Sequence, residues 1–383
     1  MTDATATAIE ETTALVARLA AALGGEVLAG VDAPAYGPQL GFGRDERPWG
    51  PGITPLLEYG LLKVHGADAA AFLQAQLTND VAGLVGNETR LAGYCSVKGR
   101  LTASAWIWRD EAQQTFWLAC SRDIAAAFAR RLTMFVLRAK VKVENASDTI
   151  ALVGTMRQAG TSQPSPQAEP VRLPPVVIDA ATAAAVGVGD EIGAGDRSVG
   201  ALDRTMFMVS SATLAQTLAD LRDAGAALLP TEAWRRLEVV SGVARINAAS
   251  QDLFVPQMVN FELVNGVSFS KGCYPGQEIV ARSQYLGKLK RRMFLAVGEG
   301  EVPSPGADVT SADSDAAEPV GQVVLAAPLP GHRRYILLFE SKTAAVPGEL
   351  TDSAQTGLRV GGGLLERLPL PYAIPASDKL DGR

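Results

Sequence analysis

The run from Val267 to Arg282 changes the direction of the chain twice, and this limits what can be built around it. Its first four residues alternate apolar and polar side chains, which predicts a half-buried strand there. Gly272 and the pair Pro275-Gly276 then each permit a turn, so Cys273 lies in a tight loop. The residues after Gly276 have an acid near the start and a base later, which favours a first helical turn, although their β-branched pair would also suit a strand.

The thiol of Cys273 has two possible roles in such a loop. If a helix follows, the sulfur lies near the helix N-terminus and near the Lys271 ammonium, an environment that lowers a thiol pKa and favours the thiolate. Cys273 and Lys271 are then candidate catalytic residues, and Glu278 can pair with Arg282 one turn further on. The alternative is a small buried hydrophobe in a turn, because free cysteine is among the most buried residue types.

Size and charge narrow the class of protein. The chain has 383 residues, which predicts two or three domains rather than a single core. A net charge of −6 and a sequence pI near 5.2 argue against strong direct binding of nucleic acid, since phosphate binding needs a basic field. One local basic cluster consists of Lys288, Lys290, Arg291 and Arg292. A solvated strand edge explains this cluster as well as a phosphate contact does, and we favour the strand edge.

The potential metal ligands are scattered along the chain. Three cysteines, Cys95, Cys120 and Cys273, and two histidines, His65 and His332, form no zinc or iron–sulfur ligand pattern, so we expect no metal centre. Unpatterned cysteines also give no disulfide framework, which fits a reducing compartment. The N-terminus lacks the basic region of a secretory signal, and no apolar run approaches the length of a membrane span. We therefore expect a cytoplasmic protein without membrane contact.

Helical and strand periodicity divide the chain into units. The first ordered unit predicts an α+β layer of split β-α-β type, with one helix on each side of antiparallel strands. Residues 231–241 predict a helix with Thr231 as its N-cap, residues 161–175 a proline-rich linker, and the short strands after Arg291 a small antiparallel barrel. The expected units are a peripheral helix and loop at 1–50, a first α+β domain at 51–160 completed by parts of 235–290, a second α+β region with the Cys273 loop at 176–290, the barrel at 291–370 and a tail at 371–383.

The run Lys271-Gly272-Cys273-Tyr274-Pro275-Gly276-Gln277-Glu278, together with Arg282, resembles the K-G-C-Y-x-G-Q-E-x-x-x-R signature of the YgfZ family of folate-binding proteins. These are relatives of the aminomethyltransferase (T-protein) of the glycine cleavage system. Other stretches also resemble the family. They are Gly66-Ala67-Asp68, Phe72-Leu73-Gln74, Gln76-Leu77-Thr78-Asn79-Asp80, Tyr94-Cys95 with Lys98-Gly99-Arg100, and Phe254-Val255-Pro256-Gln257 with Asn260.

The resemblance implies an α+β fold of three domains around a central hole, with a C-terminal antiparallel β-barrel and a tetrahydrofolate or a derivative in the hole. Of the family's two folate-contacting tryptophans, one falls on Trp234 and the other on Tyr59, a departure. Without the resemblance, Trp234 would more often be core packing. An aromatic face at Tyr59 can still stack on a ligand ring, worth about 0.5–1.5 kcal/mol. Asn247 is another departure, because relatives often carry aspartate there. The implied folate-binding set is Tyr59, Trp234, Asn247, Gln277, Glu278 and Arg282.

A further departure distinguishes between the relatives. Aminomethyltransferases carry an aspartate just after the hairpin glycine, because transfer of the carbon unit needs a carboxylate, whereas Gly99 is followed here by Arg100-Leu101-Thr102-Ala103. The resemblance therefore implies a folate-binding factor for the assembly or repair of iron–sulfur clusters in other enzymes, including radical enzymes that thiolate tRNA. Iron–sulfur enzymes and assembly proteins would be its partners, and Cys273 the working thiol. Two alternatives stay open: a folate-dependent aminomethyltransferase and a non-catalytic, folate-sensing scaffold.

Overall fold

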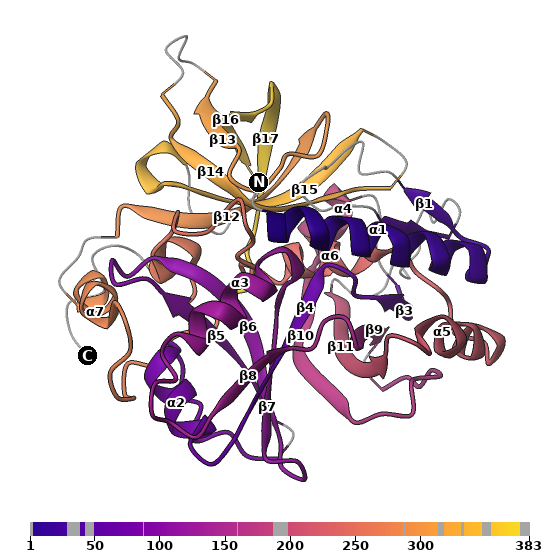
Figure 1. The fold of residues 1–383 in the computed structure, drawn as a ribbon. Coiled ribbons are helices and arrows are strands. Elements are labelled where there is room, and N and C mark those ends of the chain that lie inside the picture. Colours follow the sequence, from indigo (N-terminus) through magenta and orange to yellow (C-terminus); the bar gives the residue numbers. More distant parts are fainter. Residues whose placement is uncertain are drawn as a thin grey trace.

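Sheets form the framework of the computed structural model, which describes residues 3–28, 39–42, 50–86, 88–158, 160–186, 198–285, 289–312, 318–330, 333–346 and 354–375. Within these residues the strands form a two-stranded, a four-stranded and a five-stranded sheet and a closed barrel. Figure 1 shows the barrel, in orange and yellow, above the two larger sheets. The α+β class and the C-terminal antiparallel barrel predicted from the sequence are confirmed.

The five-stranded sheet is antiparallel and has the order β5-β6-β7-β4-β8. Its elements are β4 (Tyr59–His65), α2 (Ala69–Gln76), β5 (Thr89–Cys95), β6 (Leu101–Asp110), β7 (Thr115–Ser121), α3 (Arg122–Thr133) and β8 (Lys142–Asn145). Leu62, Phe72 and Phe128 share one buried cluster, so α2 and α3 cover the same face. Leu61 and Trp106 point to the other face and join the central core. The prediction of one helix on each side is therefore wrong, because the central core occupies the second face.

The four-stranded sheet has the order β10-β11-β9-β3. Its elements are β3 (Gly52–Pro55), β9 (Ile150–Gln158), β10 (Pro170–Asp179), α4 (Ala180–Ala185), β11 (Ser198–Ser210) and α5 (Leu214–Asp223). The run predicted as a linker, 161–175, is thus partly strand. β10 tolerates its prolines because it lies at the sheet edge and because the pairing with β11 is irregular between Leu173 and Val176, where two prolines fall. One sheet joins residues from both sides of this run.

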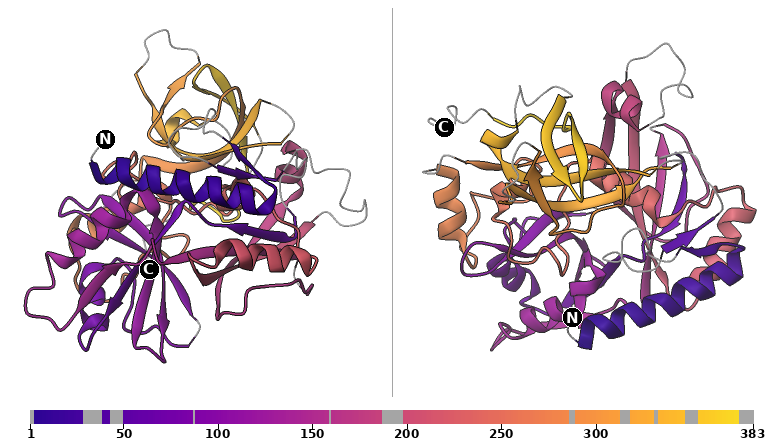
Figure 2. Two further views of the ribbon diagram at one scale, coloured as in Figure 1. Left: turned by 45° about the vertical axis from the view of Figure 1, so that its right-hand side comes forward. Right: turned by 90° about the horizontal axis from the view of Figure 1, so that it is seen from above.

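The helix α1 (Asp3–Leu23) lies across the outside of both layers (Figure 2, left). It contacts α3 of one layer and α5 of the other. Val16, Leu19 and Leu23 are buried in a cluster with Leu214 and Leu218 of α5, as their helical spacing predicts. An antiparallel pair follows, β1 (Glu26–Leu28) with β2 (Gln39–Gly41). Neither α1 nor any other helix in the described residues is long and apolar enough to cross a membrane.

The barrel closes in the order β12-β15-β14-β13-β16-β17. Its strands are β12 (Arg291–Glu299), β13 (Asp308–Ser311), β14 (Gly321–Pro328), β15 (Arg334–Lys342), β16 (Ala354–Val360) and β17 (Gly363–Leu368). Side chains alternate between two apolar clusters along these strands. Phe294 and Phe339 pack together with ring centroids 5.6 Å apart, whereas Leu295 and Leu338 join the central core. The barrel wall is therefore buried on both faces where it meets the rest of the chain.

The helix α6 (Thr231–Val240) is the central element, because all of its residues are buried. It contacts β14 and β15 of the barrel and β3 and β10 of the four-stranded sheet. A Cβ at Gly154 of β9 would lie 2.6 Å from a ring carbon of Trp234, so the indole needs a glycine there. The predicted helix is present, but Pro230 is its N-cap, not Thr231. The chain is extended at Pro230 and already helical at Thr231, whose hydroxyl has no hydrogen-bond partner.

Candidate functional site

Cys273 lies exposed in the loop that leads into the helix α7 (Gln277–Tyr285). We call residues 270–276 the Cys273 loop. Gln277 closes its turn, since the Gln277 amide donates to the Tyr274 carbonyl at 3.2 Å and the Gln277 side-chain oxygen accepts from the Tyr274 amide at 3.3 Å. Gly276 has a φ of 78°, which favours glycine. The tight loop and the following helix are as predicted, and the alternative of a buried thiol is wrong.

The residues before this loop do not form the predicted strand. Their backbone instead bonds to the segment that follows α2. The Ser268 amide donates to the Thr78 carbonyl at 2.9 Å, and the Thr78 hydroxyl donates to the Gly266 carbonyl at 2.6 Å. The Asn79 side-chain amide bridges the carbonyls of Leu91 and Asn265 at 2.7 Å each. The alternation of apolar and polar residues therefore belongs to a loop that lies on the five-stranded sheet.

Lys271 fastens the Cys273 loop to the C-terminal end of α2. Its ammonium donates to the carbonyls of Gln74 and Leu77, a favourable place for a cation, and it lies 4.9 Å from the centroid of the Tyr274 ring. Burial lowers the pKa of Lys271 to about 8, and electrostatic interactions with Asp80 and Cys273 oppose this shift. Lys271 thus combines a structural role with a positive charge beside the Cys273 sulfur.

The hairpin between β5 and β6 supports the Cys273 loop from another side. A Cβ at Gly276 would lie 2.3 Å from the Ser96 carbonyl oxygen, and one at Gly99 would lie 2.8 Å from the Cβ of Ile279. The tip is held in turn by Arg100, which donates to the Leu253 carbonyl. Segments from four parts of the sequence therefore meet at this loop. They are 74–80, 96–100, 252–254 and 265–279.

The signature residues on α7 lie at the surface. Glu278 and Arg282 are exposed, and in the part of the chain that the structure describes neither forms an ion pair. The predicted pairing of Glu278 with Arg282 is therefore wrong. Gln277 is half-buried and is used by the turn described above. None of the three lines the pocket that lies between β4, β6, β11 and the C-terminal end of α6.

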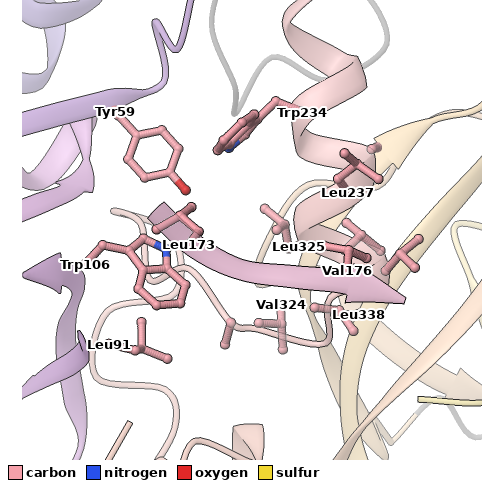
Figure 3. Packing of buried hydrophobic residues seen from close by; sticks show 14 of the residues in the cluster. Tyr59, Leu91, Trp106, Leu173, Val176, Trp234, Leu237, Val324, Leu325 and Leu338 are labelled. Carbon is pink, nitrogen blue, oxygen red and sulfur yellow. The ribbon is translucent and has the colours of Figure 1, made fainter. Parts of the chain in front are cut away.

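The central pocket lies where β4, β6 and β11 approach the C-terminal end of α6. Tyr59 and Trp106 extend from the five-stranded sheet toward Trp234 of α6 (Figure 3). The polar and aromatic residues that line the pocket are Tyr59, Ser104, Trp106, Arg204, Glu238, Ser241 and Arg245. The cavity volume is about 10 Å³, the space of about one water molecule, so a larger ligand needs side chains to move.

Buried charges surround this pocket, and we call Glu58, Arg235, Glu238 and Arg245 the buried charge cluster. Glu58 pairs with Arg235 at 2.6 Å and with Arg245 at 2.5 Å, and Arg245 also lies 3.3 Å from Glu238. The Tyr59 hydroxyl donates to the Glu238 carboxylate, and the Arg245 guanidinium lies 5.0 Å from the centroid of the Tyr59 ring. Burial raises the pKa of Glu238, and the Arg245 charge opposes that shift. Removing one partner of such a buried ion pair would leave the other charge buried without compensation, which is strongly destabilising.

Two other residues of the implied folate-binding set, Trp234 and Asn247, are buried but do not line the central pocket. Trp234 is 2% exposed in the central core, and its indole N–H has no hydrogen-bond partner. It lies beside the pocket, because Arg204 of the pocket lining is 5.8 Å from the centroid of its ring. Asn247 is buried, but its side-chain oxygen accepts from the amides of Ala249 and Ser250 at 3.1 Å and shapes its own turn. Tyr59 is thus the member of that set that lines the pocket.

Four charged residues around the pocket were missed by sequence reasoning. They are Glu58, Arg204, Glu238 and Arg245. The one local signal is the density of charge in α6, which has Arg235, Arg236 and Glu238 next to Trp234. Charges at such spacing usually mark a solvated helix face, and Glu58, the partner of Arg235, lies far away in the sequence. No local pattern could therefore reveal the cluster.

The basic cluster noted in the sequence is largely neutralised. Arg291 pairs with Glu340, and the buried Arg292 pairs with Glu262 at 2.5 Å. Lys290 is exposed, and Lys288 lies outside the described residues. Both arginines belong to β12, which has β15 and β17 as neighbours in the closed barrel, and Arg292 is buried, so the predicted solvated strand edge is wrong. Among the described residues no group of three or more His, Cys, Asp or Glu side chains is placed to hold a metal ion.

Comparison with known proteins shows which proteins this chain is similar to. No protein-family profile matches the chain. The chain is 30% identical over 262 residues to the tRNA-modifying protein YgfZ of Colwellia psychrerythraea, covering 67% of this chain and 75% of the relative. It is 28% identical over 330 residues to the protein of that name from Cronobacter sakazakii, covering 84% and 93%.

One solved structure shows the fold. The glycine cleavage system aminomethyltransferase T from Bartonella henselae superposes with a TM-score of 0.57 at 14% sequence identity, covering 84% of this chain and 86% of that one. At this identity the likeness is one of fold. The chain therefore has the fold of an aminomethyltransferase, with two α+β layers and a barrel, as the family resemblance implied.

Proposed function

Because the chain belongs to the family of the tRNA-modifying protein YgfZ, we propose that it binds a tetrahydrofolate-type ligand and supports the assembly or repair of iron–sulfur clusters in other enzymes. Its partners would be iron–sulfur enzymes and assembly proteins, among them radical enzymes that thiolate tRNA. The observation that carries the proposal is the exposed thiol of Cys273, presented on a loop that other segments hold in place.

The surroundings of Cys273 support a working thiol. A thiolate that binds iron or sulfur, or that exchanges with a disulfide, must reach a partner molecule, and Cys273 is exposed whereas Cys95 and Cys120 are buried. Burial raises the pKa of Cys95 to about 12, which keeps that thiol protonated. Lys271 adds a positive charge near the Cys273 sulfur. Of the three cysteines, Cys273 alone combines access with a neighbouring cation.

The central pocket supports a folate-type ligand by its chemistry. A pterin is a flat ring with N–H donors and a carbonyl acceptor. The Glu238 carboxylate can accept from such donors, and the faces of Tyr59 and Trp106 can stack on the ring. A reduced folate would supply one-carbon or redox chemistry when bound. With a cavity of about 10 Å³, entry requires Tyr59 or its neighbours to move.

The structure gives the transferase alternative little support. The position that would need a carboxylate is occupied by Arg100, whose guanidinium donates to the carbonyls of Asp252 and Leu253. The guanidinium thus holds the hairpin rather than a reacting group. Steady release of ammonia or methylene-tetrahydrofolate from an aminomethyl-lipoyl carrier would nevertheless establish the transferase.

The cluster part of the proposal is tested in cells that lack the protein. They are resupplied with the wild type, Cys273→Ser or, as a matched thiol control, the buried Cys120→Ala, at equal protein levels. We expect the wild type and Cys120→Ala to restore a cluster-dependent dehydratase and the methylthiolation of tRNA, and Cys273→Ser to restore neither. Full rescue by Cys273→Ser would reject the thiol role, and no rescue by any form would reject the function in cluster maintenance.

The folate part is tested separately by calorimetric titration of the purified protein with tetrahydrofolate. We expect saturable binding with one site. Replacing the aromatic ring by Tyr59→Ala should weaken that binding by about tenfold, through loss of stacking and packing. A wild type that shows no binding would reject the folate part and leave the thiol part untouched.

A further inference from the structure

Arg204 of β11 has a buried guanidinium at the central pocket, and no carboxylate in the described part of the chain pairs with it. It is 3% exposed and lines the pocket. One of its terminal nitrogens donates to the Pro174 carbonyl at 3.3 Å, and its Nε has no hydrogen-bond partner. Within the described residues no carboxylate forms an ion pair with it. A buried guanidinium that is only partly hydrogen-bonded is costly to fold and calls for an explanation.

The charged residues around Arg204 in the described part of the chain leave its positive charge unbalanced. Arg235 and Arg245 pair with Glu58 and Glu238, so with Arg204 there are three guanidinium groups against two carboxylates. The buried residues Glu232 and Arg236 of α6 add one charge of each sign. The protein as a whole has a net charge of −6, yet the described residues of this interior region carry one positive charge in excess. An anion that enters the pocket would balance it.

We propose that Arg204 binds a carboxylate of the ligand that occupies the central pocket. This rests on the proposed folate function, because tetrahydrofolate carries carboxylates on its glutamate tail. The guanidinium is suited to the task, since its planar fork can donate two parallel hydrogen bonds to one carboxylate. Binding would also give the Nε of Arg204 an acceptor, which none of the described residues provides.

The neighbours of Arg204 are compatible with this role. Its guanidinium lies 5.8 Å from the centroid of the Trp234 ring, so one side is supported by an aromatic face. Glu238 and Tyr59 are close enough to act on its charge, but the ion pair that Glu238 forms within the described residues is with Arg245 and not with Arg204. Arg204 is therefore positioned by its surroundings while its charge stays available.

The test compares Arg204→Met with a matched control, Arg172→Gln. Arg172 lies on β10 in register with Thr205, next to Arg204, and is exposed. Two ligands are titrated: tetrahydrofolate, and 6-methyltetrahydropterin, which has the same ring system but no carboxylate. We expect Arg204→Met to weaken tetrahydrofolate binding by about 10- to 100-fold and to leave binding of the pterin unchanged. Arg172→Gln should change neither.

Thermal unfolding without ligand provides the second readout. Removing an unpaired buried charge in favour of an apolar side chain of similar length should raise the melting temperature of Arg204→Met above that of the wild type. Higher stability together with weaker tetrahydrofolate binding is the pattern expected for a ligand-binding charge. A lower melting temperature with unchanged affinity would show that Arg204 is structural and overturn the proposal. An equal loss for both ligands would assign Arg204 to the ring and overturn the carboxylate contact.

A third arm separates this inference from the folate proposal. If the wild type binds neither tetrahydrofolate nor the pterin, the folate proposal fails, and sodium glutarate, a free dicarboxylate, then probes Arg204. Glutarate that raises the melting temperature of the wild type but not of Arg204→Met would support the carboxylate site. Absence of any such stabilisation would overturn it.

Discussion

Gly276 has no side chain, and this allows the Cys273 loop to pack against the hairpin between β5 and β6. A Cβ there would meet the Ser96 carbonyl oxygen at 2.3 Å, and the φ of 78° is strained for other residues. Gly272 on the other side of Cys273 differs, because a Cβ there would meet nothing within 4 Å. The packing of the loop therefore requires a glycine at position 276 but not at position 272, although both glycines lie close to Cys273 in the sequence.

This difference gives a prediction with an internal control. We expect Gly276→Ala to lower the free energy of unfolding by about 1–3 kcal/mol, from backbone strain and overlap with the hairpin. Gly272→Ala should change it by less than about 0.5 kcal/mol. Urea denaturation measures both. Equal effects of the two variants would contradict the close contact with Ser96.

Lys271 predicts a dependence of stability on pH. Its folded pKa of about 8 lies below the ordinary value of 10.5, so between these values the unfolded chain binds more protons and the free energy of unfolding rises with pH. Because Lys271 is partly exposed, solvent screening limits this rise to about 1 kcal/mol. We expect Lys271→Met to lack the rise when unfolding is followed by urea titration from pH 7 to 10.5.

The matched control for that measurement is Lys98→Met, at the exposed tip of the hairpin. It should keep the pH profile of the wild type. A profile of Lys271→Met that runs parallel to the wild type would show that Lys271 titrates normally, and the interpretation of its burial would then be wrong.

Among the elements, α6 links the layers because it places charges and aromatic groups where three sheets meet. Its Arg235 reaches Glu58, which lies just before β4, and its Glu238 reaches Tyr59 at the start of that strand. Buried polar contacts thus connect the start of β4 to α6. The leucines on either side of this point in the chain are apolar. The orientation of α6 and the shape of the central pocket depend on these few contacts.

Removing one charge from this arrangement should be costly. We expect Glu58→Gln to lower the free energy of unfolding by about 3–5 kcal/mol, because it leaves Arg235 and Arg245 buried without their shared carboxylate. The matched control is Glu88→Gln, which breaks the ion pair of Glu88 with Arg90 at the surface and should cost less than about 1 kcal/mol. Chemical denaturation compares the two. Similar small losses would mean that water replaces the buried pairs.

The elements also show what the sequence can and cannot predict. The turn at Gly276, the helix after it and the strands of the barrel were predictable, because their signals are local glycines, prolines and alternation. The strand predicted before the Cys273 loop does not form. Thr78, which is far away in the chain, makes the hydrogen bonds that a neighbouring strand would need. The burial of α6 could not be predicted for a similar reason, because its charges suit a solvated face unless Glu58 and Arg245 lie beside them.

For the whole molecule, the distribution of charge sets an expectation about nucleic acid. The net charge is −6, and the two arginines of the apparent basic cluster, Arg291 and Arg292, are paired with Glu340 and Glu262. We therefore expect tRNA to bind with a Kd weaker than about 100 µM at 150 mM salt, as filter binding would measure. Low-micromolar binding that falls steeply with added salt would contradict this and favour direct contact with tRNA.

The attachment of the Cys273 loop also has a consequence for the order of synthesis. The five-stranded sheet is built from residues 59–145 alone, and the loop is attached to it by contacts that span 188 and 194 residues. As the ribosome releases the chain, the sheet and its hairpin emerge long before Cys273. Cys273 therefore follows the sheet and the hairpin out of the ribosome, and a nascent chain interrupted before Cys273 carries the platform without the thiol.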